Sequence, residues 1–376
     1  MEAVDSKKRW VGLFYAAFTL WLLGYLTLAH RYNGKDYEVY LDAIAALGSG
    51  SSPYSFENAT SFHYSPVGLL PFLALQVLPV AGQHFLIFLL SLVALFRMTY
   101  VCLRLLDPNR QLGDLPLPML IAPWILVNQG IGFQFESGNI NLILVYLMVE
   151  GYYAVFRNKT AWGFFLMALP ALFKPAFGIV PYFLFALHPK QYFSACLRAG
   201  LGLAATALLP FLFWPAAQLY KDWWLSNAAH THAILSGEIV GANLSLLSLA
   251  YDKLGLSVGQ SLGLVFFPSL LFFHWLARGK QPTTAFSLAL LFLYLFSPAT
   301  FPYSIVGLML PATLGLWVCW KDKRCLPIYS IFLIGILFVN VNFLGRTLYN
   351  GTAVPWRLQG LLTLPLVWVV SRRSSD

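Results

Sequence analysis

Residues 10–29 read Trp10-Val-Gly-Leu-Phe-Tyr-Ala-Ala-Phe-Thr-Leu-Trp-Leu-Leu-Gly-Tyr-Leu-Thr-Leu-Ala29, a stretch without a single charge. At roughly 1.5 Å per residue, a helix of about 20 residues crosses a hydrocarbon core of about 30 Å. Similar apolar stretches recur to the end of the chain, so this one is a membrane span and not a cleavable signal peptide. The sequence therefore predicts an all-α, polytopic membrane protein.

Composition and charge agree with a lipid environment. Of the 376 residues, 59% are hydrophobic and only 10% are charged, which is too few charges for a water-exposed surface. The net charge is +9, but the basic residues form short clusters between apolar runs, as the positive-inside rule predicts, and not the single patch of a nucleic-acid-binding protein. We therefore expect no nucleic-acid partner, and a multi-pass protein of the cell membrane with both termini in the cytoplasm.

The apolar runs predict the membrane spans. They lie near residues 10–29, 66–81, 83–105, 116–132, 139–156, 193–213, 258–277, 284–297, 301–320, 326–343 and 352–370, with a hairpin over 161–187. With both termini inside, the number of crossings is even, and we expect about 12 in one integral-membrane domain covering residues 1–376. Residues 66–132 hold three runs between two outer points, so one Pro-rich run there is expected to be re-entrant or shallow.

Two predicted outer loops are long enough to carry function, residues 30–65 and about 214–257. In the first, apolar residues between 37 and 47 alternate with Asp36, Glu38 and Asp42, which predicts a short amphipathic helix on the membrane surface. Tyr40 follows Asp36 at helical spacing, and Gly48 to Tyr54 and His63-Tyr64-Ser65-Pro66 come next. Sugar transfer needs a base and aromatic walls, which these residues supply; the alternative is that the carboxylates form a solvated helix face.

Several motifs resemble those of one enzyme family. The first-loop run Asp36-Tyr-Glu-Val-Tyr40, Gly50, Pro53-Tyr54 and Tyr64-Ser-Pro66 resembles the first outer loop of the polyprenol-phosphate-mannose-dependent mannosyltransferases of glycosyltransferase family 87, in the GT-C superfamily. Gly138-Asn-Ile-Asn141 is similar to the family's Gly-Gln-x-Asn motif, with Asn139 in place of Gln. Lys174-Pro175, Gly241-Ala-Asn243-Leu-Ser245 and Ser297-Pro298-Ala-Thr300 resemble its Lys-Pro, Gly-Asn-x-Ser and Ser-Pro-x-Ser/Thr elements. Where the family commonly carries Trp and then His, this chain has Phe301, Pro302 and Tyr303.

The resemblance implies an inverting transferase with an active site outside the cytoplasm. It implies a GT-C fold, a polyprenyl-phosphate donor carrying mannose, and an acceptor that is a lipid-linked or envelope glycan, with membrane lipids around it. Asp36 is then the candidate base, and a polyprenyl-phosphate-arabinofuranose donor is an alternative. A transporter or flippase of a lipid-linked sugar is the other class, which Arg97 and Glu150 inside apolar runs keep open.

The remaining candidate residues would bind the donor's phosphate or sugar. Lys174 lies between two apolar stretches, where it either meets a lipid phosphate or snorkels to the headgroups. Tyr303 can form a hydrogen bond but cannot supply the charge of an imidazolium. Asn139 and Asn141 either contact sugar or headgroups or serve as helix caps and interhelical hydrogen-bond partners, and Asn243 is a candidate sugar contact. The other candidates are Tyr54, Tyr64, His63, His230 and His232. His230-x-His232 with Glu238 lacks the third and fourth ligands of a metal site, so we expect no metal and no other cofactor.

Overall fold

The computed structural model describes residues 2–27, 34–54, 62–107, 115–236, 243–298, 300, 302–339, 344 and 357–372. These residues form helices joined by turns, and no strand occurs among them. The α-helices are α1 (Glu2–Thr27), α2 (Lys35–Gly48), α3 (Leu69–Leu75), α4 (Val80–Leu106), α5 (Leu117–Leu126), α6 (Asn128–Ser137), α7 (Asn141–Phe156), α8 (Thr160–Ala168), α9 (Ile179–Leu187), α10 (Pro189–Leu208), α11 (Ala216–Ser236), α12 (Leu246–Leu254), α13 (Val258–Ser261), α14 (Phe267–Ala277), α15 (Pro282–Phe296), α16 (Met309–Lys321), α17 (Leu326–Phe338), α19 (Leu358–Leu361) and α20 (Leu364–Ser371). The all-α prediction is confirmed for the described residues.

Short helical turns extend or join several of these helices. They are η1 (Pro66–Gly68), η3 (Leu169–Leu172), η4 (Pro175–Gly178), η5 (Leu209–Leu212), η6 (Leu262–Phe266), η7 (Pro302–Leu308) and η8 (Lys323–Cys325). Many contain or precede a proline, which lacks the amide hydrogen that a regular helix interior requires. The apolar stretches are therefore broken more often than their hydropathy alone indicates.

Four helical segments among the described residues are long and apolar enough to cross a membrane. They are Val80–Leu106, Pro189–Leu212, Val258–Ala277 and Ser304–Lys321. Eight further apolar segments have 10–17 residues: Arg9–Gly24, Pro66–Leu75, Leu117–Leu126, Asn141–Phe156, Thr160–Leu172, Pro175–Leu187, Pro282–Phe296 and Leu358–Ser371. The chain is thus a membrane protein with apolar helices of unequal length, and not the row of uniform spans that the hydropathy pattern suggests. Parts of the expected spans 10–29, 326–343 and 352–370 lie outside the described residues.

The region around the first predicted loop contains two short helices. The expected amphipathic helix exists as α2, and its buried side, which includes Tyr37 and Tyr40, packs on other parts of the protein in one apolar cluster with Phe72 of α3. The run 66–81 yields only η1 and the seven-residue α3, too short to cross, which agrees with a shallow Pro-rich run. Residues 30–33 and 55–61 of this loop lie outside the described part.

Two predictions about the middle of the chain have different outcomes. The hairpin expected over 161–187 is present as α8–η3 followed by η4–α9, with Lys174 between the two arms. The segment expected as a loop over about 214–257 is largely helical, since α11 alone has 21 residues. Its polar residues bond to the first predicted loop, where Asp222 accepts from Ser52 and Asn227 donates to the backbone carbonyl of His63.

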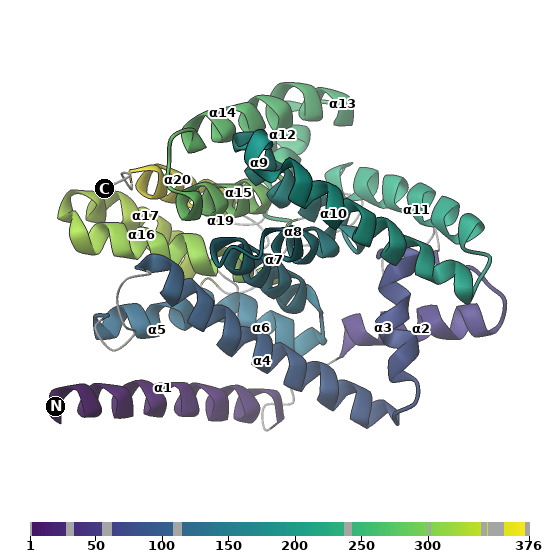
Figure 1. The fold of residues 1–376 in the computed structure, drawn as a ribbon, viewed down its shortest axis with the longest axis horizontal. Helices are drawn as coiled ribbons and strands as arrows, with labels where there is room; N and C mark the ends of the chain where they lie inside the picture. The colour runs from purple at the N-terminus through teal and green to yellow at the C-terminus, as the bar shows by residue number, and fades with distance from the viewer. Residues whose placement is uncertain are drawn as a thin grey trace.

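The chain termini and the first predicted loop lie at opposite ends of the long axis of the molecule (Figure 1). Both chain termini lie at the left end of the view, whereas α2 and α3 lie at the right end. A large apolar core built mainly from α4, α5, α7, α15 and α16 occupies the middle of the bundle. A second, smaller apolar cluster joins α2 and α3 to Ile140 and Leu219. The candidate site lies where these two clusters meet.

Candidate functional site

Asp36 occupies the first turn of α2 and is half-buried. The preceding Gly34 has φ 60° and ψ 11°, a left-handed conformation that glycine adopts without strain. The amide of Gly34 donates a 3.2 Å hydrogen bond to the carbonyl of Glu136 at the end of α6. This backbone bond attaches the start of α2 to the turn that carries the Gly138-Asn-Ile-Asn141 motif.

Asn139 joins the carboxylate to that motif. Its Nδ2 donates a 2.7 Å hydrogen bond to Oδ2 of Asp36, and its Oδ1 accepts a 2.8 Å bond from the backbone amide of Asn141. Gly138 ends α6 at φ 69°, which turns the chain so that Asn139 can make both bonds. The structure therefore brings together the candidate base and the predicted polar residues of a motif about one hundred residues away.

Lys174 extends the same network. Its Nζ donates a 2.9 Å hydrogen bond to Oδ1 of Asn141 and lies 5.1 Å from the centroid of the Tyr64 ring. The residue as a whole keeps some solvent exposure, but its ammonium group is buried. This burial lowers the pKa of Lys174 to about 8, while the nearby charge of Asp36 opposes the shift. Three sequence motifs thus meet in one chain of contacts, Asp36–Asn139–Asn141–Lys174.

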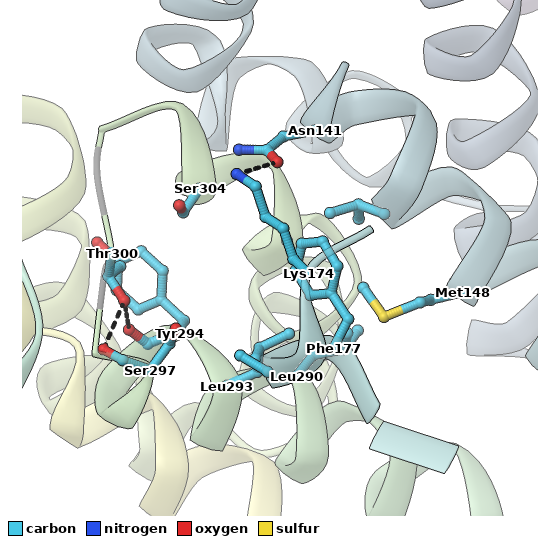
Figure 2. Close-up of a pocket in the computed structure, with 13 residues that line it drawn as sticks. Asn141, Met148, Lys174, Phe177, Leu290, Leu293, Tyr294, Ser297, Thr300 and Ser304 are labelled. Carbon is cyan, nitrogen blue, oxygen red and sulfur yellow. Dashed lines mark hydrogen bonds between the residues drawn. The ribbon is translucent and has the colours of Figure 1, made fainter. Parts of the chain in front are cut away.

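A cavity of about 60 Å³ lies beside Lys174. Figure 2 shows that its polar end carries Lys174 and Asn141 opposite Ser297, Thr300 and Ser304. The rest of its wall is apolar and comes from Val145, Met148, Ala176, Phe177, Leu290, Leu293, Tyr294 and Gly307. The cavity is therefore small, and its lining is polar at one end and apolar elsewhere.

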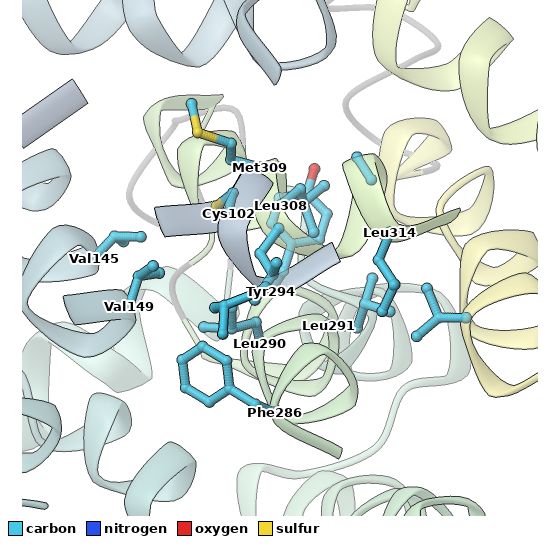
Figure 3. Close-up of a cluster of buried hydrophobic side chains, with 14 of the residues drawn as sticks. Cys102, Val145, Val149, Phe286, Leu290, Leu291, Tyr294, Leu308, Met309 and Leu314 are labelled. Carbon is cyan, nitrogen blue, oxygen red and sulfur yellow. The ribbon is translucent and has the colours of Figure 1, made fainter. Parts of the chain in front are cut away.

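The apolar wall of the cavity belongs to the main core. Val145, Leu290 and Tyr294 line the cavity and also pack with Met309 and Leu308 in the cluster of Figure 3. Buried side chains in such a core are close-packed and hold single conformations. The close-packed core therefore fixes the positions of the helices that carry the polar end of the cavity.

Asn243 places Thr300 on the cavity. Its Nδ2 donates to the carbonyl of Pro298 at 2.9 Å, and its Oδ1 accepts the amides of Thr300 at 3.2 Å and Ser245 at 3.1 Å. The amide of Leu244 also donates to the carbonyl of Thr300 at 2.6 Å. The two motifs around Asn243 and Ser297 thus form one unit, in which Asn243 is bonded to backbone groups; a direct contact of Asn243 with sugar stays a prediction.

Arg357 supports this unit from the C-terminal segment, and the sequence reading missed it. Its Nε donates to Oγ of Ser248 at 2.9 Å, and that hydroxyl donates to the carbonyl of Ser245 at 2.9 Å. A Cβ on the nearby Gly360 would lie 2.4 Å from the carbonyl oxygen of Leu244, so the backbones are in close contact. The signal available in the sequence was a charged residue at the start of an apolar run.

Two of the three candidate histidines lie together. The rings of His63 and His230 stack with centroids 3.5 Å apart and an angle of 24°. Burial, aided by the charge of Lys174, lowers the pKa of His230 to about 4, so this imidazole is neutral at pH 7. Trp223 Nε1 and Asn227 Nδ2 both donate to the carbonyl of His63, at 3.1 and 3.0 Å. His232 is exposed on the other side of α11.

The predicted tyrosines have different positions. The Tyr64 hydroxyl lies 3.1 Å from that of Tyr40, and burial raises the pKa of Tyr64, which keeps it neutral beneath Lys174. Tyr54 is buried and donates to the carbonyl of Tyr64 at 3.1 Å. The side chain of Tyr303 and all of Glu238 lie outside the described residues. Ser304, on the cavity wall, was not predicted because a lone serine carries no signal in the sequence.

Two charged residues in the apolar helices pair with each other. Arg97 of α4 donates from Nε to Oε2 of Glu150 at 2.9 Å and from Nη2 to Oε1 at 2.7 Å. This bidentate pair joins α4 to α7 and does not touch the site. Within the described part of the chain, no group of three His, Cys, Asp or Glu side chains could hold a metal ion.

Comparison with known proteins gives one match. The family model described as glycosyltransferase family 87 matches residues 62–298, more than half of the chain. The matched range contains Asn139, Asn141, Lys174 and Asn243, whereas Asp36 precedes it. No curated protein and no solved structure is similar enough to the chain to match it.

Proposed function

The chain belongs to glycosyltransferase family 87, and on that premise we propose that it transfers mannose from a polyprenyl-phosphate donor to a lipid-linked or envelope glycan outside the cytoplasm, with inversion. The observation that carries this proposal is the continuous chain Asp36–Asn139–Asn141–Lys174. It joins a carboxylate, which can accept a proton, to a cation that suits a phosphate leaving group. Such a pair at one site is what transfer from a sugar phosphate requires.

Each group has one task in the proposed reaction. The acceptor hydroxyl attacks the anomeric carbon from the face opposite the phosphate, and Asp36 takes its proton. The bond between the anomeric carbon and the phosphate oxygen breaks, and polyprenyl phosphate leaves. Lys174 stabilises the charge that builds on this phosphate. His230 is neutral at pH 7, so it contributes hydrogen bonding and the cationic task falls to Lys174.

Topology supports an outer site. The basic clusters after α7 and α9 are assigned to the cytoplasmic side by the positive-inside rule. α2 and the tip of the α8–α9 hairpin are then directed away from that side. Leaving η1 with α3 out of the twelve apolar segments and adding the apolar helix α17 gives 12 crossings, an even number that would put both termini in the cytoplasm. Both chain ends lying at one end of the molecule agrees with an even number (Figure 1).

The two alternatives are arabinofuranose as the donor sugar and transport without chemistry. The contacts around Asp36 and Lys174 are equally compatible with either sugar, since they concern the acceptor proton and the phosphate. The residues that favour transport are Arg97 and Glu150, and they form a bidentate pair with each other away from the site, which supports a structural role for them. Glycosyl transfer is therefore the better-supported function.

The test is transfer by purified protein in vesicles, with a lipid extract as acceptor and, in parallel assays, labelled polyprenyl-phosphate-mannose or labelled polyprenyl-phosphate-arabinofuranose as donor. Asp36→Asn keeps the shape of the side chain but removes the base, so the rate should fall by about 10²- to 10⁴-fold. Asp42→Asn is the matched control, because Asp42 is an exposed carboxylate on the same helix. A folded Asp36→Asn protein with undiminished transfer would remove Asp36 as the base, and label delivered only from the arabinofuranose donor would change the sugar.

A further inference from the structure

Helix α11 exposes apolar side chains along one face. Several of its polar residues bond to other segments: Asp222 accepts from Ser52 at 2.8 Å, Asn227 donates to the carbonyl of His63, and His230 stacks on the His63 ring. Its outward face carries Trp224, Leu225, Ala228 and Ala229 at helical spacing, with Lys221 one turn before them and His232 one turn after them, and Trp224 is 66% exposed. Adjacent exposed apolar side chains of this kind mark a surface that contacts a membrane or another protein.

The helix lies beside a membrane-spanning segment and returns along it. Tyr220 donates from its hydroxyl to the carbonyl of Ala207 at 2.6 Å, and its ring stacks on Phe211. In Figure 1, α11 turns back from the right-hand end of α10 toward α12. In the adjoining segment Pro189–Leu212, only 17% of the residues in the most apolar stretch are buried, and Leu208, Phe211 and Leu212 are exposed. The outward face of α11 thus continues the exposed apolar surface of Pro189–Leu212, which is a candidate membrane span.

Helix lengths place α11 at membrane depth. Pro189–Leu212 has 24 residues, about 36 Å as a helix. The hairpin arm Thr160–Leu172 also starts next to basic residues that are predicted to be cytoplasmic, but it is only about half as long. Lys174, at the tip of this arm, therefore lies deeper in the membrane than the outer end of Pro189–Leu212. The ring of His230 stacks on that of His63, and the amide of Ser65 donates to the carbonyl of Phe173, the residue before Lys174. Helix α11 therefore runs from the end of α10 toward Lys174.

We propose that the outward face of α11, formed by Trp224, Leu225, Ala228 and Ala229, contacts the lipid of the outer leaflet, and that α11 is a non-spanning wall between this lipid and the site. Lys221 and Gln218, one to two turns nearer the end of α10, then lie at headgroup level, where a cation meets lipid phosphates. α11 itself is not apolar enough to be a spanning segment. The occupant of this face is therefore lipid, and not water or a second protein.

The test measures what collides with spin labels on α11. Single cysteines replace Leu225 and Ala229 in a background without Cys102, Cys196, Cys319 and Cys325. The labelled proteins are placed in vesicles of phosphatidylcholine and phosphatidylglycerol. The ratio of collisions with oxygen to collisions with a water-soluble nickel chelate should match that of a label at Leu201 on α10. It should exceed that of a label at Asp42 on α2 several-fold.

Either other result overturns the proposal. A ratio like that at Asp42 means that the face is in water. Low collision rates with both reagents at Leu225 and Ala229 mean that protein covers it. The substituted residues face away from His63, so the fold should tolerate them; Ala228→Cys provides a third label on the same face if Leu225→Cys aggregates. This measurement does not depend on glycosyl transfer, so its failure is distinct from failure of the proposed function.

Discussion

The side-chain amide of Asn139 donates a 2.7 Å hydrogen bond to the carboxylate of Asp36, although 103 residues separate them in the chain. The bond orients one carboxylate oxygen, and in the proposed reaction the other takes the proton of the acceptor hydroxyl. The same Asn139 side chain accepts from the amide of Asn141, whose own side chain binds Lys174. Three consecutive hydrogen bonds through one motif therefore connect the proposed base to the proposed phosphate partner.

Replacing Asn139 with alanine should slow transfer without abolishing it. The change removes a hydrogen bond to a carboxylate, worth about 1.5–3 kcal/mol, so kcat should fall about 10- to 100-fold while KM for the donor changes little. Asn128→Ala is the control, because Asn128 is exposed at the start of α6. Steady-state kinetics of both variants decide the point, and an unchanged kcat in Asn139→Ala would show that Asp36 needs no orientation by this amide.

The charge of Lys174 should set the alkaline limit of donor use. Burial lowers its pKa to about 8, so the free protein carries the ammonium group below this pH and loses it above. We expect kcat/KM for the donor to fall about tenfold per pH unit above about pH 8. In Lys174→Arg the fall should move to higher pH, because a guanidinium stays protonated. Profiles from about pH 6 to about pH 10 test this, and an identical alkaline limb in both proteins would assign it to another group.

Gly360 should tolerate no side chain. An added Cβ would lie 2.4 Å from the carbonyl oxygen of Leu244, whose amide binds Thr300 on the cavity. Gly360→Ala should therefore lower the unfolding free energy by about 1–3 kcal/mol and reduce transfer. Gly200→Ala on α10 is the matched change, since nothing lies within 4 Å of its added Cβ. Thermal unfolding in detergent compares the two, and equal stabilities would mean that the contact at Leu244 relaxes freely.

The Arg97–Glu150 pair should be structural. Glu150→Met leaves a guanidinium unpaired among apolar helices and should cost about 1–3 kcal/mol of stability. The double variant Arg97→Met with Glu150→Met removes both charges and should recover most of that loss, with transfer close to the native rate. Melting temperatures and transfer rates of the single and double variants provide the test. Lost transfer in a stable double variant would instead assign the pair a part in function.

Much of the fold could be predicted because it depends on local sequence. Uncharged runs and the basic clusters between them identify helices and a membrane protein, and alternation of Asp36, Glu38 and Asp42 with apolar residues predicts α2 correctly. The hairpin with Lys174 between its arms follows from two apolar runs around a Lys-Pro step. The family resemblance, which the family match now confirms, came from short motifs that are visible without any tertiary information.

Helix lengths could not be predicted from hydropathy in the same way. Proline breaks and short turns divide several apolar runs, so only four described helical segments are long enough to span by themselves. The segment 214–257, which is too polar to resemble a span, is largely helical because α11 turns its polar residues onto His63 and Ser52. Those partners lie more than one hundred and sixty residues away, and no local pattern specifies them.

By itself, the sequence determined that this chain is a helical membrane protein of a glycosyltransferase family and which motifs carry its polar residues. Only the tertiary structure decided that Asp36, Asn139, Asn141 and Lys174 form one hydrogen-bonded chain, that Asn243 holds Thr300 at the cavity, and that Arg357 supports them. The physical reason is that apolar runs and charge clusters are properties of neighbouring residues, whereas these bonds join segments that meet only when the helices pack.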